Sequence, residues 1–543
     1  MKNVLIIGSG ISGLSCAISC AELGMKATIL SPYVSERAQS VLAAGGINAV
    51  LDHSEDSIES HIEDTLKGGA YIAGTESVKG LCTNAPDVVR WLERLGTVFT
   101  RENGEISRRA FGGQSHNRTC YCGAATGKQI VTALTMEARR FEGKGLIRRM
   151  IRCDFYSALI KDGRCYGAVV FNENTGKMEL IRADALVIAA GGQNALFGKT
   201  TGSQLCDGYA AGRLFMQGVD LKNLEFIQYH PTTIKTVHKK MLVSEAARGE
   251  GGRLYYLDGD RRVYFMEDKF GPGGNLMPRD IVSKCIYETH KQVYLDVTFL
   301  GKETILKKIP EIYELCQKYY GIDISQESIP VDPSVHFFMG GIAVRNNHET
   351  NIKDLYAVGE CASIYHGANR LGGNSLLAAA YSGRVAAASI AKSAEEKTAS
   401  DDEFKDELKA AQDVLTNNGG TKDRLTVKYV RDMLAQIMNR ELGIVRCEEE
   451  LKKGIEDIEY YIGVADETVP DDAELPYYTY SLKAILVLAK AVLICAQERR
   501  ESRGAHLRSD HPETDDGFKA PTIISYDDGR FTVTYDREGR YES

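Results

Sequence analysis

The sequence has little that favours a nucleic acid, a membrane or export. Its 66 Lys and Arg residues are outnumbered by 74 Asp and Glu residues, so a basic binding face is not expected. No apolar run reaches the roughly 20 residues that a bilayer span needs. The first apolar run, residues 4–7, is too short for the core of a signal peptide. We therefore expect a cytoplasmic protein with no membrane span of its own and no nucleic-acid partner.

The number and spacing of the cysteines indicate neither a disulfide framework nor a metal site. The 13 cysteines are scattered and odd in number, which is typical of reduced thiols in a large chain. Cys120 and Cys122 form a C-x-C pair, but no second Cys or His pair stands at metal-ligand spacing. We expect this pair to contribute packing and the chain to bind no metal, while a redox role for the pair stays open.

A dinucleotide-binding pattern opens the chain. A β-branched run at residues 4–7 leads into GSGISG (residues 8–13), a helical pattern at residues 14–23 and a second strand at residues 26–30. A diphosphate binds at such a helix N-terminus, because glycines let the backbone approach it. The second strand ends in Ser31 rather than in the acid that usually holds a ribose. This departure argues against NAD and is compatible with FAD.

Three more glycine-rich segments point to the same cofactor. Residues 43–49 read AAGGINA, and residues 185–192 form a buried-strand pattern that ends in two glycines. Residues 359–377 combine a strand, a glycine turn and a helix N-terminus with the polar side chains of Glu360 and Arg370. Because these segments lie far apart, a nucleotide-binding domain interrupted by an insertion explains the spacing best.

The insertion supplies side chains that suit a small dianion. It holds His230, Arg248, Arg279 and His336, which Arg370 joins from the glycine-rich segment. Arginine binds carboxylates through two parallel hydrogen bonds and keeps its charge at any ordinary pH. A single histidine is more often a core or surface residue with ordinary hydrogen bonds than a ligand-binding residue, so the prediction depends on the whole set.

Helical patterns dominate elsewhere. Residues 54–69 and 76–95 read as amphipathic helices. From about residue 396 a helical bundle is expected, with helices at 403–415, at 426–462 with a break near Gly443 or Gly454, and at 481–497. The arginine-rich residues 499–510 are expected to dock on the core or on a partner. Residues 521–541 alternate apolar and polar side chains around Asp528-Gly529, which predicts a hairpin.

With these motifs, the chain resembles the flavoprotein subunits of succinate dehydrogenases and fumarate reductases, together with the similar L-aspartate oxidases. The motifs occur in the family's order: GSGISG, AAGGINA, FGGQS, AAGG, QYHPT, SEAARGEGG, MPRD, HFFMGG, GANRLGGNSLL and ESRGAH. The resemblance implies an α/β fold, namely a two-part Rossmann-like FAD-binding domain with an inserted α+β capping domain and a C-terminal helical bundle. The implied domains are residues 1–220 and 338–395 for FAD binding, 221–337 for the cap, 396–515 for the helices and 516–543 for a tail.

The resemblance also implies roles for single residues. His230, Ser244, His336 and Arg370 would bind the two substrate carboxylates, and Phe111 or Gln114 would line the pocket. Arg279 would pass a proton to or from the substrate carbon, with Glu245 and Arg248 as its relay. The implied FAD contacts are Gly8, Gly10, Ile11, Ser12, Gly13, Ser31, Ser40, Ala44, Gly45, Gly46, Ala190, Gly191, Asp207, Glu360, Asn374, Ser375 and Leu376.

The sequence departs from the family pattern in three places. Gln39 stands where membrane-bound members carry the histidine that bonds covalently to FAD, so we predict dissociable FAD and a bias toward fumarate reduction or an oxidase. Phe111 stands where aspartate oxidases place an acid to meet the substrate ammonium, which favours plain dicarboxylates. After Asp510 the chain is shorter than respiratory dehydrogenases, which leaves an iron–sulfur partner subunit open.

The resulting prediction is an FAD-dependent oxidoreductase that interconverts fumarate and succinate. An L-aspartate oxidase that makes iminoaspartate for NAD biosynthesis is one alternative, and a reductase of another small unsaturated carboxylate is a second. A flavoprotein that only passes electrons to a partner is a third. The joint presence of His230, Glu245, Arg279, His336 and Arg370 argues against that last alternative.

Overall fold

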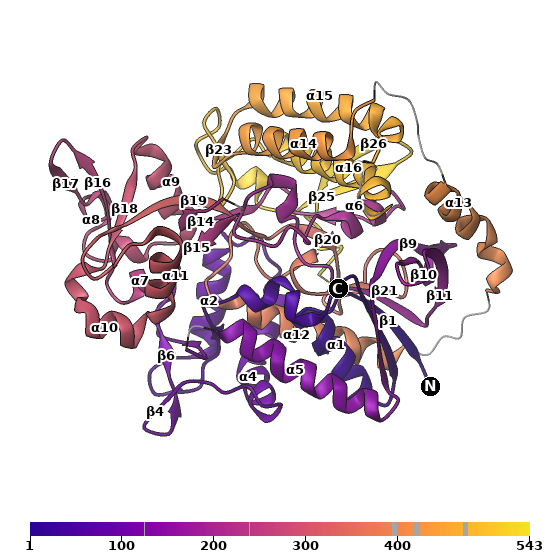
Figure 1. Cartoon of the computed structure of the whole chain (residues 1–543), viewed down its shortest axis with the longest axis horizontal. Helices are drawn as coiled ribbons and strands as arrows, with labels where there is room; N and C mark the ends of the chain where they lie inside the picture. The colour runs from indigo at the N-terminus through magenta and orange to yellow at the C-terminus, as the bar shows by residue number, and fades with distance from the viewer. Residues whose placement is uncertain (124, 238, 394–398, 417–423, 471–475, 543) are drawn as a thin grey trace.

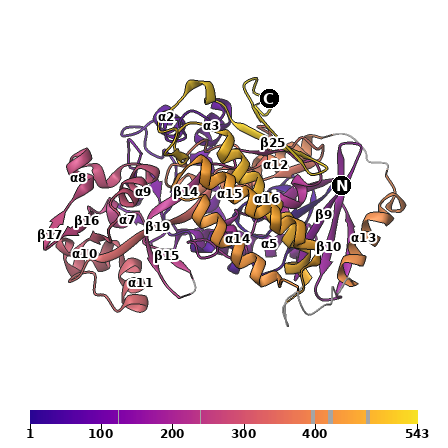
Figure 2. The same cartoon turned by 90° about the horizontal axis from the view of Figure 1, so that it is seen from above.

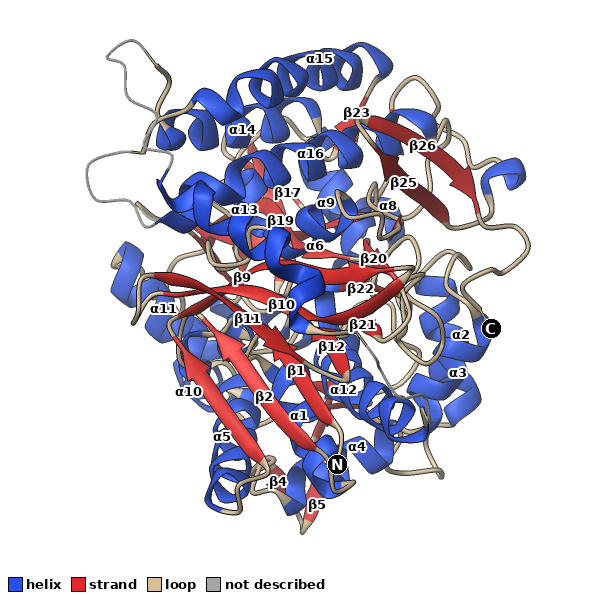
Figure 3. Ribbon diagram, turned by 90° about the vertical axis from the view of Figure 1, so that its right-hand side faces the viewer, coloured by secondary structure: helices blue, strands red, loops and turns tan. Residues whose placement is uncertain are grey.

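Five parallel strands, in the order β21-β12-β1-β2-β8, form the sheet of the nucleotide-binding part (Figure 3). The computed structural model describes residues 1–123, 125–237, 239–393, 399–416, 424–470 and 476–542. The strands are β1 Asn3–Ile7, β2 Lys26–Ser31, β8 Ile147–Ile151, β12 Ala185–Ile188 and β21 Leu355–Ala357. Because β1 pairs with β2 and β12, and β12 pairs with β21, segments that are far apart in the sequence end at the same edge of one sheet.

The turn after β1 is tight, and glycines make it possible. Helix α1, Ile11–Glu22, begins directly after Gly10, three residues before the predicted start at residue 14. A Cβ on Gly13 would lie 2.0 Å from the Gly8 carbonyl oxygen, so only glycine fits there. The predicted strand, glycine turn and helix are therefore confirmed.

Helices and a second sheet flank the parallel sheet. Helix α1 packs against α5, Thr126–Gly143, and α12, Asn374–Lys392 (Figure 1). An antiparallel layer packs on β2 and β12, and its strands are β9 Cys153–Lys161, β10 Arg164–Asn172 and β11 Lys177–Arg182. Since α1 has neighbours on several sides, it is buried almost throughout, which explains its apolar composition.

The insertion forms a separate lobe around a six-stranded sheet in the order β15-β14-β19-β18-β16-β17 (Figure 2). Its apolar side chains form a core distinct from that of the nucleotide-binding part. The strands are β14 Ile227–Lys235, β15 Lys240–Leu242, β16 Arg253–Asp258, β17 Arg261–Val263, β18 Val293–Asp296 and β19 Ile329–Phe338. The helices are α7 Ala246–Gly249, α8 Phe265–Phe270, α9 Arg279–Glu288, α10 Gly301–Lys308 and α11 Pro310–Tyr320. We call this lobe the cap.

Three long helices, α14 Val427–Glu441, α15 Glu448–Val464 and α16 Pro476–Glu498, pack together in the C-terminal region (Figure 2). The predicted break falls at Gly443, whereas Gly454 lies inside α15, where a Cβ would be 3.0 Å from Glu441. Helix α16 is long and apolar enough to cross a membrane, although no such run was expected from the sequence. Because 72% of its most apolar window is buried in the protein, its composition is that of a core helix.

Two helix predictions were wrong in detail. Residues 76–95 form two helices, α3 Thr75–Thr83 and α4 Ala85–Arg94, because Pro86 has no amide hydrogen and cannot continue a helix. Helix α13, Lys405–Thr416, packs on β10 and β11 instead of joining the bundle (Figure 3), since Phe404 and Ala411 bury apolar surface there. The predicted domain boundary at residues 395 and 396 lies outside the described residues.

The tail completes a second five-stranded sheet in the order β22-β20-β13-β25-β26. The predicted hairpin is confirmed as β25 Thr522–Asp527 and β26 Arg530–Tyr535. Its partners are β13 Leu221–Lys222, β20 Gly341–Ala343 and β22 Ala362–Ser363. Residues 221 and 222 were expected to open the cap, but they belong to this sheet because β13 pairs with β20 and β25.

Arg499 fixes the tail to the interior. Its guanidinium is fully buried and donates to the Glu225 and Glu501 carboxylates, to the Phe518 and Ala520 carbonyls, and to the Thr522 hydroxyl. All of its N–H groups are therefore used. The arginine-rich segment thus docks on the core of its own chain, which decides between the two expectations.

We expect Arg499→Met to lower the free energy of unfolding by about 3–5 kcal/mol, because the Glu225 carboxylate would stay buried without its cation. Thermal unfolding followed by circular dichroism would show this as a lower midpoint. Arg500→Met is the matched control, since Arg500 is the next residue and is exposed. Equal midpoints for the two variants would contradict this role.

Candidate active site

One cavity of about 440 Å³ is lined by both the nucleotide-binding part and the cap. Its walls come from the turn after β1, from residues 43–46, from residues 189–193 and from the segment that begins at Gly359. The cap contributes residues from β14, β15 and β19 and from α9 and α11. The distant glycine-rich segments that were predicted to build one site therefore line one cavity.

The end of the cavity near β1 fits the diphosphate of FAD. Gly8, Gly10 and Ser12 line it at the N-terminus of α1, whose first N–H groups have no partner within the helix. A Cβ on Gly8 would lie 2.2 Å from the Ala189 carbonyl oxygen, so this cradle depends on glycine. The Ser31 hydroxyl, in the place of the usual acid, accepts a 3.0 Å hydrogen bond from the Ser9 hydroxyl.

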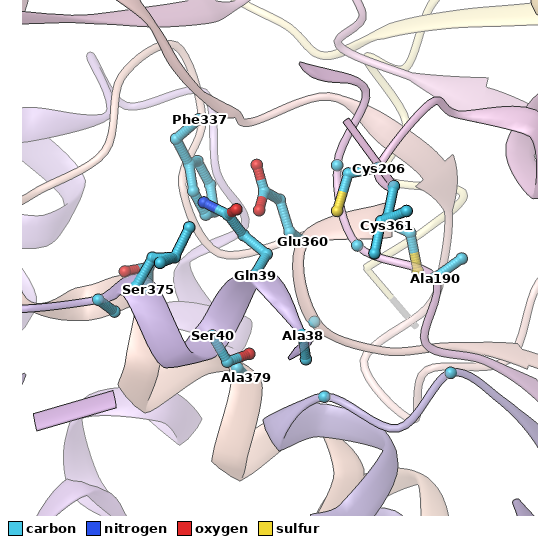
Figure 4. A pocket seen from close by; sticks show the side chains of 18 of the residues that line it. Ala38, Gln39, Ser40, Ala190, Cys206, Phe337, Glu360, Cys361, Ser375 and Ala379 are labelled. Carbon is cyan, nitrogen blue, oxygen red and sulfur yellow. The ribbon is translucent and has the colours of Figure 1, made fainter. Parts of the chain in front are cut away.

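The middle of the cavity fits a flat ring with polar edges, such as the isoalloxazine of FAD. Figure 4 shows Gln39, Phe337 and Glu360 on one side and Cys206 and Ala190 on the other. The Gln39 Oε1 atom is buried and has no hydrogen-bond partner within the described chain, so a bound group would satisfy it. Burial raises the pKa of Glu360 to about 7.

Most of the predicted cofactor residues line this cavity, and three do not. The lining residues are Gly8, Gly10, Ser12, Ser31, Ser40, Ala44, Gly45, Gly46, Ala190, Gly191, Asp207, Glu360, Ser375 and Leu376. Ile11, Gly13 and Asn374 are absent from the wall. The Asn374 amide is used inside the protein, since Oδ1 accepts from Asn48 at 2.8 Å and Nδ2 donates to Thr65 at 3.0 Å.

The predicted carboxylate-binding residues His230, Ser244, His336 and Arg370 all line the same cavity, and we call them the dicarboxylate clamp. The rings of His230 and His336 lie edge to face, with centroids 5.2 Å apart. Thr201 holds His336 through a 2.9 Å bond between Oγ1 and Nδ1. Burial and the charge of Arg279 hold the pKa of both histidines well below the usual range, so both rings are neutral.

Arg279 and Glu245 form a buried ion pair beside the clamp. The Glu245 Oε2 atom accepts from Nε of Arg279 at 2.8 Å and lies 2.7 Å from Nη2, and the Oε1 atom of Glu245 accepts the Gly112 N–H at 2.8 Å. Burial acts to raise the pKa of Glu245, but Arg279 and Arg248 lower it overall. The carboxylate is therefore charged.

Arg248 lies on the far side of Glu245. Its Nη2 is 3.5 Å from Glu245 Oε1, and its Nη1 donates to the Asn275 carbonyl at 2.7 Å. Burial lowers the pKa of this guanidinium. Arg248 does not line the cavity, and its contact with Glu245 connects it to the site.

Of Phe111 and Gln114, the two candidates for the pocket lining, only Phe111 lines the cavity. Phe111 lines the cavity with a ring that is 3% exposed. Gln114 does not, because its Nε2 donates to the Gly372 carbonyl at 2.8 Å and to Asn48 at 3.1 Å. Gln114 therefore holds the glycine turn in place behind the wall.

Sequence reasoning missed two residues of the site. Gln228 accepts from both Arg279 and Arg370, and Thr201 orients His336. The QYHPT motif contains Gln228 two residues before His230, which is a signal that could have identified it. Thr201 stands in no quoted motif, so only the fold places it beside His336.

Cys120 and Cys122 are buried away from this cavity, and burial raises the pKa of both thiols to about 12. Within the described ranges no group of three or more His, Cys, Asp or Glu residues is arranged to hold a metal ion. Buried thiols of this kind are poor nucleophiles, because the thiolate is the reactive form.

Known proteins are similar to this chain over nearly its whole length. A family model described as "FAD binding domain" matches residues 3–376, and one described as "Fumarate reductase flavoprotein C-term" matches residues 431–539. The succinate dehydrogenase flavoprotein subunit of Bacillus subtilis (strain 168) is 35% identical over 544 residues, which cover 95% of this chain and 92% of that protein. The L-aspartate oxidase of Yersinia pestis is 33% identical over 548 residues, which cover 96% and 98%.

A solved structure agrees with these matches. A variant of FrdA from E. coli quinol fumarate reductase has a TM-score of 0.89 and 31% identity, and the match covers 98% of this chain and 96% of that chain. The first family model spans more than half of the chain, and the sequence identity to the relatives is higher than a shared fold alone requires. The chain therefore belongs to the family of FAD-dependent oxidoreductases that contains the flavoprotein subunits of succinate dehydrogenase and fumarate reductase and the L-aspartate oxidases.

Proposed function

We propose that the protein interconverts fumarate and succinate with FAD as its cofactor, and that it favours fumarate reduction. The observation that carries the proposal is a single cavity in which a dinucleotide cradle meets the dicarboxylate clamp and the Arg279–Glu245 ion pair. A charged clamp beside a buried proton-carrying pair suits the addition of hydrogen to a double bond between two carboxylates.

The clamp residues would bind and orient the substrate. Arg370 supplies a positive charge for one carboxylate, and neutral His230 and His336 can each donate one N–H without adding charge. Pinning both carboxylates polarises the double bond and makes the reaction effectively intramolecular. When bound, FAD supplies or accepts the hydride.

Arg279 would give the proton to the other substrate carbon. An arginine in water is a poor acid, with a pKa above roughly 12. Here Glu245 contacts its Nε and Nη2 and can return the proton, and Arg248 stands next in line at 3.5 Å from Glu245. The relay consists of groups that are nearly or fully buried, so proton transfer along it does not depend on water entering the clamp.

Phe111 favours a plain dicarboxylate over aspartate, because an apolar ring in the wall cannot pair an ammonium group. L-aspartate oxidation is the second candidate, and the observation in its favour is Gln39, which lines the cavity where a covalent histidyl link would stand. A reductase of another small unsaturated carboxylate would use the same clamp. Reduction also needs an electron source, for which an iron–sulfur partner subunit is the candidate.

We expect FAD to be dissociable, because the Gln39 amide cannot form the histidyl bond to flavin. Acid precipitation of the purified protein should leave yellow flavin in the supernatant. Reduced holoenzyme titrated anaerobically with fumarate should then recover the oxidised flavin band in stoichiometric amounts. Flavin that stays with the pellet would contradict the first expectation. Fumarate that leaves the flavin reduced, while aspartate bleaches the oxidised form, would favour the oxidase.

Arg279→Lys should lower turnover by roughly 10²–10⁴-fold, the usual contribution of a positioned proton donor. Binding of a dicarboxylate should change much less, because His230, His336 and Arg370 remain. Steady-state kcat and the Kd of malonate, read from the flavin spectrum, separate the two effects. Arg261→Lys is a matched control at an exposed cap position. Equal losses of turnover and of malonate binding in R279K would contradict the role of Arg279 as the proton donor.

A further inference from the structure

Gln228 bridges two of the arginines that line the cavity. It lies on β14, is fully buried, and its Oε1 accepts from Arg279 Nη1 at 3.1 Å and from Arg370 Nη2 at 2.9 Å. Arg279 comes from the cap helix α9, whereas Arg370 comes from the segment that precedes α12. One amide oxygen thus joins the predicted proton donor to the predicted carboxylate binder.

The orientation of the Gln228 amide follows from its partners. A guanidinium can only donate, so the amide oxygen must face Arg279 and Arg370. The amide nitrogen then donates to the Asn369 Oδ1 at 2.7 Å and to the Arg370 carbonyl at 2.8 Å. Asn369 in turn donates from Nδ2 to the Asp280 carboxylate at 2.8 Å. The hydrogen bonds therefore run from the arginines through Gln228 and Asn369 to Asp280. The bonds to Asn369 and to the Arg370 carbonyl fix the orientation of the Gln228 amide.

A neutral acceptor has a particular advantage between two buried guanidiniums. Each needs a hydrogen-bond acceptor, because a buried charged donor without one is costly. A carboxylate at position 228 would satisfy both but would also cancel a positive charge that the substrate dianion has to meet. The amide oxygen takes one hydrogen bond from each arginine and leaves both charges available.

We propose that Gln228 is the positioning residue that holds Arg279 and Arg370 at a fixed separation while leaving the clamp its positive charge. This inference rests on the proposed function, since it assigns Gln228 to the binding of a dicarboxylate between these arginines. Gln228 does not line the cavity, so it acts through the two arginines and not on the substrate.

Two variants of Gln228, with side chains of nearly equal size, distinguish the effect of losing the hydrogen-bond acceptor from the effect of adding a negative charge. Gln228→Met removes the acceptor and adds no charge, so kcat should fall by roughly 10- to 100-fold, the scale of hydrogen bonds to charged groups. Gln228→Glu keeps an acceptor in the same place but adds a negative charge. Its affinity for malonate, a dicarboxylate without a reducible double bond, should fall by a larger factor than that of Q228M.

Gln217→Met and Gln217→Glu are the matched controls. Gln217 also holds its neighbours through its amide, with Oε1 accepting the Ala158 N–H and Nε2 donating to the Ala158 carbonyl, and it does not line the cavity. FAD content and the thermal midpoint are measured for all four variants. A purely structural role for Gln228 would lower these two quantities and leave kcat per bound flavin and malonate affinity unchanged.

The outcomes separate this inference from the proposed function. If wild-type protein reduces fumarate and binds malonate while Q228M and Q228E keep wild-type kcat and malonate affinity, the role of Gln228 is overturned and the proposed function stands. If wild-type protein does neither, the proposed function falls and this inference falls with it. Because Q228E has the shape of the native side chain, its malonate affinity decides the matter should Q228M fail to fold.

Discussion

Burying several guanidinium groups around one carboxylate is the constraint on which this site depends. Arg248, Arg279 and Arg370 are nearly or fully removed from water, and Glu245 is the acid that lies between two of them. Burial and Arg279 hold the pKa of Arg370 well below its usual range, which shows how costly the charge is there. The Gln228 amide oxygen accepts from Arg370 and the Asn275 carbonyl accepts from Arg248, while Nε of Arg370 and Nε and Nη2 of Arg248 have no hydrogen-bond partner within the described residues.

The architecture brings these hydrogen-bonding groups together from three separate parts of the chain. The cap brings Arg279 and Arg248, the segment before α12 brings Arg370, and the Gly112 N–H reaches Glu245 from the loop that also carries Phe111. A Cβ on Gly112 would lie 2.6 Å from Glu245 Oε1, so the close approach of that loop requires glycine. The cap is thus held by the hydrogen bonds of the site as well as by its own apolar core.

Local patterns in the sequence predicted what is local in the structure. The strand, turn and helix at residues 3–22 and the hairpin around Asp528-Gly529 follow from periodicity and glycine placement, and the structure has both. The roles of Gln114 and Asn374 could not be predicted in this way, because their partner Asn48 is distant in the sequence and only the fold brings it close. The same is true of Arg499, whose carboxylate partner Glu225 is 274 residues away. Motif order predicted many of the residues that meet at the cavity, but it missed Gln228 and Thr201 and did not tell which residues line the cavity and which lie behind its wall.

The charges of the site support the proposed preference for a plain dicarboxylate. Three guanidiniums outnumber the Glu245 carboxylate, and the neutral His230 and His336 add no charge. Glu360 also lines the cavity, but burial raises its pKa to about 7, so the site keeps a positive excess near neutral pH. A dianion would balance that excess, whereas an amino dicarboxylate carries one negative charge less and needs an acceptor for its ammonium. The side chain at position 111 is an apolar ring and offers no such acceptor. A neutral amide at position 228 keeps this balance, because it accepts from two arginines without cancelling either charge.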